Sequence, residues 1–402
     1  MGRIDDWRIA PKVKVRALLL PVLLAGFAGA CREGEDQQGA SFIPLGPPSS
    51  GNHGCATANQ DFSGGGALTA VDMGGFITDA FSRMAAAADS PLLYVTGASA
   101  EILELDVTDP AATVARSLVG TGVIDALLVS AGIVVPAQLS GVAVIDAGNL
   151  VVVEHSSNTL LLVDRLVPDT VAFFAGLPSS AGGYADGAGG QIRFSFEDPT
   201  AVVPTASGQI FVADSGNHVI RRLFVGAVPQ SETVAGTGAP GFLDGNLGSS
   251  QFDTPTGLSI SCDGRLLVTE TGAAGQGGNR LRALSIGSRD FFGNLTGMAV
   301  TLAGSGVDAS SEGIGEDAEL ASPGDVFSTN AGEIYFVDGS TGHARRYAVD
   351  TGLVDCAFGA VSCVATMGNL SGAENVGLTA SSNGDFFFLL GDLSSLLFFD
   401  PS

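Results

Sequence analysis

A repeated unit runs along most of the chain and limits the folds that it can adopt. Glycines that each open a short apolar run lie 60, 56, 68 and 52 residues apart, at Gly148, Gly208, Gly264, Gly332 and Gly384. A second set of glycines closes the units at intervals of 56, 60, 68 and 64 residues, at Gly120, Gly176, Gly236, Gly304 and Gly368. Because two independent markers share one period, the sequence predicts a tandem structural repeat.

The clearest unit predicts four short strands. The first three span residues 201–203, 210–213 and 219–224, and the fourth ends at the sequence AGTG. The connection between the second and third strands reads DSGN, a set of residues that favours tight turns. Units of several strands that must stack on their neighbours to bury both faces are typical of propeller blades rather than of a helical solenoid.

We therefore predict an all-β fold, a six-bladed β-propeller of four-stranded antiparallel blades. The blades are centred near residues 95, 152, 212, 268, 336 and 388. The last unit stops at Ser402, one strand short. We expect a segment such as Ala67 to Met73 to supply the missing strand, because this closure would remove the exposed edge of an open ring.

The repeat resembles the NHL family. The resemblance rests on P-x-x-V, on G-x-I-x-V-x-D-S-x-N-H-x-I-R and on AGTG-x-x-G-x-x-D-G, carried here by Pro199, Gly208, Asp214, Asn217, His218, Ile220, Arg221, Gly236, Gly241, Asp244 and Gly245. It covers about half of the chain well and implies a six-bladed propeller. Members bind proteins, RNA or peptides, and a few related propellers are metal-dependent lyases or lactonases.

The first thirty residues look like a targeting segment. Five basic residues precede an uncharged apolar stretch at 17–30, which is too short to span a bilayer as a helix. This order is typical of a secretory signal, so residues 1–30 are predicted to be a signal peptide, with a buried N-terminal helix as the alternative. Residues 31–66 are rich in Gly, Pro and Ser and predict a flexible tether, which leaves 67–402 for the propeller.

Cys31 follows Ala28-Gly29-Ala30, which resembles the cleavage box of bacterial lipoproteins. That resemblance implies lipidation at Cys31 and a place on the outer membrane or cell surface. An ordinary signal peptidase would cut the same bond, and the protein would then be periplasmic or secreted. If Cys31 carries lipid, the even set left fits two disulfides in an exported chain, with Cys356 near Cys363 and Cys55 joined to Cys262. Free buried thiols are the alternative.

The charge of the chain excludes nucleic acid as a partner. Lys plus Arg number 18 and Asp plus Glu 42, for a formal charge of −24. Removal of residues 1–30 takes away five basic and two acidic residues, which leaves 13 Arg against 40 acids and a charge of −27. A surface of this sign repels phosphates.

Four acids occupy one position of the repeat, the end of the second strand: Glu154, Asp214, Glu270 and Asp338. In a ring they would lie around one face, where oxygen ligands could hold Ca²⁺ or form a binding face. The alternative is that they bond to their turns and pair with Arg221, Arg282 and Arg345 on the third strands. A further set, Asp186, Asp244 and Glu312, precedes glycines and is interpreted as part of the turns between blades.

The histidines offer a zinc site as a hypothesis. His155, His218 and His343 fall in different units, and His53 lies in the tether. Three of them would have to converge in the central channel, which their spacing does not indicate. His218 is the repeat histidine of the NHL resemblance, whose role is usually structural.

These observations favour a binding module over an enzyme. We expect an exported, lipid-anchored monomer whose faces bind a protein or peptide of the envelope, with no cofactor and with membrane contact only through the lipid. The alternative is a metal-dependent propeller enzyme of the lyase or lactonase type, with calcium or zinc.

Overall fold

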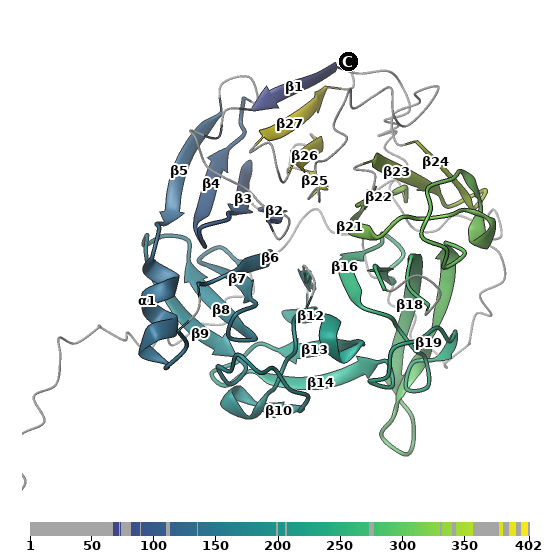
Figure 1. The fold of residues 1–402 in the computed structure, drawn as a ribbon, viewed down its shortest axis with the longest axis horizontal. Helices are drawn as coiled ribbons and strands as arrows, with labels where there is room; N and C mark the ends of the chain where they lie inside the picture. The colour runs from purple at the N-terminus through teal and green to yellow at the C-terminus, as the bar shows by residue number, and fades with distance from the viewer. Residues whose placement is uncertain are drawn as a thin grey trace, which may run out of the picture.

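The strands of the protein form antiparallel sheets around a common axis (Figure 1). The computed structural model describes residues 67–71, 73, 82–88, 90–109, 113–134, 136–197, 200–205, 207–272, 277–329, 332–339, 343–356, 378–380, 386–390 and 395–400. In this part of the chain there are six sheets, which we number in chain order. Side chains are described throughout sheets 1–5, and sheet 6 is described through its backbone.

The first two sheets have four strands each. Sheet 1 consists of β2 (Met84–Ala86), β3 (Leu92–Thr96), β4 (Ile102–Asp106) and β5 (Val114–Val119). Sheet 2 consists of β6 (Leu139–Asp146), β7 (Asn149–Glu154), β8 (Thr159–Asp164) and β9 (Val171–Ala175). Helix α1 (Val123–Ser130) lies on the connection between them. Among the described residues, no helix has the length and hydropathy of a transmembrane span.

Sheets 3–5 have five strands each. Sheet 3 contains β10 (Gly187–Ala188), β11 (Val202–Pro204), β12 (Gln209–Asp214), β13 (Val219–Phe224) and β14 (Gln230–Ala235). Sheet 4 contains β15 (Gly245–Asn246), β16 (Pro255–Ile260), β17 (Leu266–Glu270), β18 (Arg280–Arg289) and β19 (Leu295–Ala303). Sheet 5 contains β20 (Gly313–Ile314), β21 (Pro323–Ser328), β22 (Ile334–Asp338), β23 (His343–Ala348) and β24 (Leu353–Cys356).

The fifth strands correct the expectation of four strands in every sheet. The glycines that follow Asp186, Asp244 and Glu312 begin β10, β15 and β20, which pair with the outer strands β14, β19 and β24. Two-residue strands are too short to leave an alternating pattern in the sequence. Short 3₁₀ turns follow two of them, η2 (Gly189–Gln191) and η4 (Gly315–Asp317), and η3 (Ser215–Asn217) lies between β12 and β13.

Sheet 6 joins the two ends of the described chain. Its strands are β1 (Ala67–Val71), β25 (Leu378–Ala380), β26 (Phe386–Leu390) and β27 (Ser395–Asp400). β1 pairs antiparallel with β27, so the expectation that a segment starting at Ala67 supplies the last strand is confirmed. The inner strand β25 contacts β21 on one side and β2 on the other, as Figure 1 shows.

Neighbouring inner strands are tied by backbone hydrogen bonds around the axis. The Gly141 N–H donates to the Thr200 carbonyl at 2.8 Å, and the Ala201 N–H donates to the Thr256 carbonyl at 2.8 Å. A Cβ added to Gly141 would lie 2.3 Å from the Thr200 oxygen, so glycine is required for this approach. These bonds join the same level of consecutive inner strands, which therefore run in the same direction.

Between sheets 1 and 2, and between sheets 4 and 5, a threonine hydroxyl bridges the backbone groups of the two inner strands in place of a direct hydrogen bond. The Arg83 N–H donates to Thr96 Oγ1 at 2.8 Å, and that hydroxyl donates to the Ser140 carbonyl at 3.1 Å. Thr269 Oγ1 likewise accepts from the Gly257 N–H and donates to the Gly324 carbonyl. The backbone groups of the inner strands are thus satisfied between sheets, where no further strand is available.

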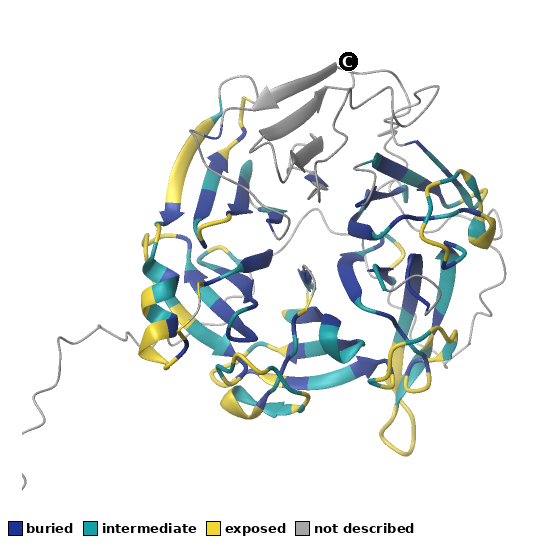
Figure 2. Ribbon diagram, in the orientation of Figure 1, coloured by how far each residue is buried: buried dark blue, intermediate teal, exposed yellow. Residues whose placement is uncertain are grey.

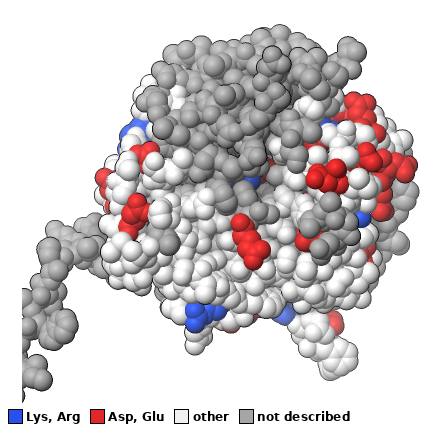
Figure 3. All heavy atoms as spheres, in the orientation of Figure 1, with Lys and Arg blue, Asp and Glu red and all other residues white. Residues whose placement is uncertain are grey.

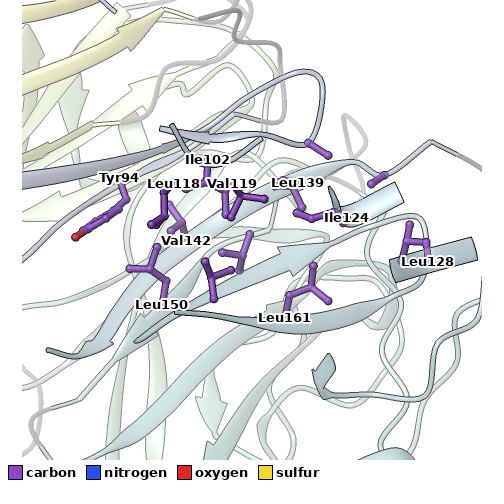
Figure 4. Packing of buried hydrophobic residues seen from close by; sticks show 14 of the residues in the cluster. Tyr94, Ile102, Leu118, Val119, Ile124, Leu128, Leu139, Val142, Leu150 and Leu161 are labelled. Carbon is purple, nitrogen blue, oxygen red and sulfur yellow. The ribbon is translucent and has the colours of Figure 1, made fainter. Parts of the chain in front are cut away.

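The hydrophobic core lies between adjacent sheets. Figure 4 shows the cluster between sheets 1 and 2, in which Ile102 and Leu118 face Val142 and Leu161. Leu128 of α1 is buried in the same cluster. In Figure 2 the buried strands lie toward the axis and the exposed residues gather at the loops and outer edges. Sheets 2–4 therefore bury both of their faces against their neighbours, as stacked repeats require.

Two of the five cysteines, Cys262 and Cys356, lie within the described residues. Cys262, in the turn between β16 and β17, and Cys356, at the end of β24, are each disulfide-bonded. Cys55 and Cys363 lie outside the described residues, as does Cys31, so the predicted pairing stays a prediction.

Candidate functional site

The four repeat acids lie at one end of the second strands, as expected, and are fully buried. Glu154, Asp214, Glu270 and Asp338 each have 0% exposure. Each accepts a hydrogen bond from a backbone N–H of the connection that precedes its own inner strand. Ser195 donates to Asp214 Oδ1 at 2.8 Å and Gln138 to Glu154 Oε1 at 3.0 Å. These acids therefore fix the connections between sheets.

Three of the acids also bind a buried arginine of the third strand. Arg221 donates to Asp214 at 2.8 Å, Arg282 to Glu270 at 2.7 Å and Arg345 to Asp338 at 2.8 Å. The arginine side chains are at most 1% exposed. This is the ion-pair alternative for the repeat acids, and it engages their oxygens with donors of the chain itself.

The turn acids extend two of these ion pairs. Asp186 binds Arg221 at 2.7 Å, and Asp244 binds Arg282 at 2.7 Å. In sheet 5 the place of the second acid is taken by the hydroxyl of Ser310, which accepts from Arg345 at 2.8 Å. Asp186 and Asp244, which directly precede β10 and β15, therefore hold the buried arginine from the other side, a role that their position next to glycine did not indicate.

Burial dominates the pKa shifts of three of the repeat acids, Asp214, Glu270 and Asp338. Desolvation raises the pKa of Asp214 to about 6 against the opposing charge of Arg221, and raises the pKa of Glu270 to about 7 against that of Arg282. The pKa of Asp338 is raised for the same reason. Raised carboxyl pKa values next to cations mean that loss of solvent outweighs the attraction of the partner.

The histidines are held apart in different roles. His155 is buried beside Ser140, with 2.7 Å between Nε2 and Oγ, and His343 is half-buried at the start of β23. His218 lies before β13, and His53 is outside the described residues. Within the described ranges, no three His, Cys, Asp or Glu side chains gather where they could hold a metal ion.

His218 belongs to a turn position that recurs in the ring. Ala100, Asn158, His218 and Asn279 all precede a third strand with φ between 54° and 58°. The Asn158 side chain accepts from the Phe196 N–H at 2.8 Å, His218 Nδ1 from Thr254 at 3.1 Å and Asn279 from Ser322 at 2.9 Å. Asn and His tolerate left-handed backbone better than most residues. His218 thus joins its turn to the connection into sheet 4.

A cavity of about 460 Å³ lies on the axis, among the inner strands of the described residues. It is lined by the inner strands of all six sheets, from β2 to Thr379 of β25. Most of its wall is apolar and includes Met84, Val142 and Val202. It extends toward the turns that join first and second strands, since Asp146 and Ala147 of the β6–β7 turn also line it.

Two charged residues lie at one level of this cavity. Arg83 directly precedes Met84 and Asp325 directly precedes Val326, at the inner-strand position that Gly141, Ala201 and Gly257 occupy in sheets 2–4. Both are buried, at 4% and 8% exposure. Sequence reasoning missed this pair, although charged residues among glycine and alanine at one repeat position were a readable signal.

Comparison with known proteins supports the fold and leaves the family open. No family model matches the chain. Suppressor of quenching 1, a chloroplastic protein of Arabidopsis thaliana, is 38% identical over 86 residues, which is 21% of this chain and 8% of that protein. The chain therefore spans a small part of this relative's length.

Solved structures with the same architecture are distant in sequence. A gluconolactonase from Xanthomonas campestris has a TM-score of 0.54 and 14% identity, with coverage of 86% of this chain and 94% of that one. A protein of unknown function from Bacteroides thetaiotaomicron has a TM-score of 0.46 and 16% identity and is covered over 56% of its length, against 65% of this chain. At these identities the likeness to the gluconolactonase shows the β-propeller fold alone.

Proposed function

We propose that this chain is an exported, lipid-anchored propeller of six NHL-like blades that binds a protein or peptide of the cell envelope. The signal-like residues 1–30, the cysteine at 31 and the acidic composition support export. The repeat pattern and the pairing of β1 with β27 support the closed ring.

The axial cavity carries the proposal. Its volume of about 460 Å³ lies within the range of pockets that enclose small ligands or a few residues of a peptide. Apolar walls would bury apolar side chains of the peptide, and Arg83 and Asp325 add charges of opposite sign to one level of the wall. Few polar groups at one level of an apolar pocket are the usual source of orientation and specificity.

The repeat acids do not support the metal-dependent alternative. The carboxylate of Asp214 accepts from Ser195, Asn217 and Arg221, and it is fully buried. A cation at this position would have to displace the donors that hold the turn. We therefore place the proposed ligand in the cavity rather than at the ends of the second strands.

A cavity-filling variant tests the binding site. Ala86 is half-buried on the cavity wall, and Ala86→Phe would occupy the space. We expect a cross-linked pull-down from intact envelopes to enrich a partner with the native chain and to lose it with Ala86→Phe. Ala188→Phe, on the short edge strand β10 that pairs with β14, is the matched control and should keep the partner. An identical set of captured proteins for all three chains would contradict the cavity as the site.

Two measurements test the rest of the proposal. Cys31→Ser should release the protein from membranes, and retention in the membrane fraction would count against the lipid anchor. Elemental analysis of the purified protein should find no stoichiometric calcium or zinc, and a stoichiometric metal would favour the enzyme instead.

A further inference from the structure

The hairpin of β18 and β19 carries two exposed aromatic side chains at its tip. Its strands are ten and nine residues long, and it projects past the outline of the molecule in Figures 1 and 3. Phe291 is 97% exposed and Phe292 is 83% exposed. Exposing two adjacent phenyl rings to water costs free energy, and such exposed rings are typical of a surface that a binding partner covers.

Hydrogen bonds hold the backbone of the turn that carries these rings. Asp290 accepts hydrogen bonds from the Phe292 N–H at 2.9 Å and the Asn294 N–H at 2.8 Å, and Gly293 adopts a φ of 85°. The rings are nearly perpendicular, with centroids 5.5 Å apart. The tip is thus organised in advance, which lowers the entropy cost of burying it in a target.

Neighbouring sheets carry exposed apolar residues at the equivalent turns, between their third and fourth strands. We call this set the hairpin rim: Val114, Leu166, Val167, Val228, Phe291 and Phe292, with exposures from 52% to 97%. It spans sheets 1–4. Since the inner strands all run in the same direction, these turns lie at one end of the ring. The hairpin rim is therefore an arc. An arc can contact a flat apolar surface more fully than a pocket on the protein could.

The charge around the tip is balanced despite the net charge of −24. Glu232 of β14 binds both Arg222 and Arg289, and the Asp290 carboxylate is bound by its own turn. Figure 3 shows acidic side chains gathered instead at the right of the view, over sheet 5. An apolar tip with a balanced base can approach a neutral surface without strong repulsion.

We propose that the hairpin rim inserts into the interfacial region of a lipid bilayer with neutral headgroups, Phe291 and Phe292 first. Aromatic and aliphatic side chains at the level of the headgroups are the usual means of such attachment. The contact is separate from the lipid at Cys31 and from the axial cavity, so its test is independent of the proposed function.

Tryptophan reporters test the insertion directly. The chain contains one Trp, Trp7, so a full-length Trp7→Phe, Cys31→Ser background is free of Trp and of the lipid site. Phe292→Trp places the reporter at the tip. Val134→Trp is the control, because Val134 is 84% exposed on the connection at the opposite end of the ring. On addition of phosphatidylcholine vesicles, Phe292→Trp fluorescence should shift to the blue and be quenched by brominated lipid, and the control should not change.

A second variant measures the strength of the contact. Phe291→Ser with Phe292→Ser should lower the vesicle partition coefficient about tenfold or more, because two apolar side chains no longer leave water. Val134→Ser should leave it unchanged. Unaltered Phe292→Trp fluorescence with vesicles would overturn the proposal. So would a blue shift that depends on protein concentration without lipid, which would identify a second copy of the chain as the target.

Discussion

The Arg221 guanidinium donates to the Asp214 carboxylate at 2.8 Å, and neither side chain is exposed to solvent. The pair joins β13 to the end of β12 and, through the Ser195 N–H, to the connection into sheet 3. Sheets 4 and 5 repeat it with Arg282 and Arg345. The most regular charged residues of the repeat therefore maintain the architecture rather than the surface that binds a ligand.

Loss of Arg221 should be strongly destabilising. Arg221→Met leaves the buried carboxylate of Asp214 without its cation, and we expect a decrease of about 3–5 kcal/mol in the free energy of unfolding. Urea unfolding at pH 7.5 measures it. Arg222→Met is the matched control on the same strand. Its pair with Glu232 is partly exposed, so we expect a loss below about 1 kcal/mol. Equal losses for both variants would contradict the buried ion pair.

The repeat and its turns could be predicted from sequence because their signals are local. The third strand of sheet 3, predicted at 219–224, is Val219–Phe224, and the second, predicted at 210–213, lies within Gln209–Asp214. The short strands β10, β15 and β20 could not be predicted, because two residues carry no periodicity. Their pairing depends on the tertiary position of the outer strands.

The direct bond between β6 and β11 should not tolerate a side chain at residue 141. Gly141→Ala would bring Cβ within 2.3 Å of the Thr200 oxygen, so the inner strands would have to separate. We expect a loss of about 1–3 kcal/mol or more in the free energy of unfolding, as for other overpacked sites. Thermal and urea unfolding measure it.

Gly248→Ala provides the control for residue 141. A Cβ at Gly248 meets no atom within 4 Å, and its backbone does not require glycine. We expect a change within about 0.5 kcal/mol, the usual range for surface substitutions. If Gly141→Ala were as stable as Gly248→Ala, this result would contradict the close approach of the inner strands at residue 141.

The axial cavity shows the limit of sequence reasoning about the site. The repeat acids stand out in the sequence because they recur in several units. Residues that recur in this way usually build the repeated unit itself. Arg83 and Asp325 differ from the residues at the same position in sheets 2–4 and thereby break the pattern. That they line one cavity follows only from the closure of the ring, which brings β2 and β21 to opposite sides of β25.

After export, the four cysteines at 55, 262, 356 and 363 should all be in disulfides, with no free thiol among them. Cys262 and Cys356 are disulfide-bonded, and we expect Cys55 and Cys363 to be their respective partners. Alkylation of the denatured, unreduced mature chain should modify no cysteine at 55, 262, 356 or 363. Peptide mapping by mass spectrometry should find the 356–363 and 55–262 pairs. An alkylated thiol at any of the four positions would contradict two disulfides.

His155 should make the protein sensitive to acid. Burial lowers its pKa from 6.5 to about 3, and the nearby charge of Arg83 acts in the same direction. The unfolded chain binds a proton at this residue below pH 6.5 and the folded chain does not. Its contribution to stability is therefore complete above pH 6.5 and is lost as the pH falls toward 3, by at most about 1.4 kcal/mol per pH unit.

A His155→Gln variant isolates this contribution. The buried acids act in the opposite sense: the raised pKa values of Asp214 and Glu270 make the folded chain more stable as the pH falls from about 7 toward 4. These acids are the same in both chains, so the difference in unfolding free energy reports on His155 alone. Between pH 7.5 and 5 we expect the advantage of the native chain over His155→Gln to shrink by about 2 kcal/mol. A difference that does not change with pH would mean that His155 is not held neutral by burial beside Ser140.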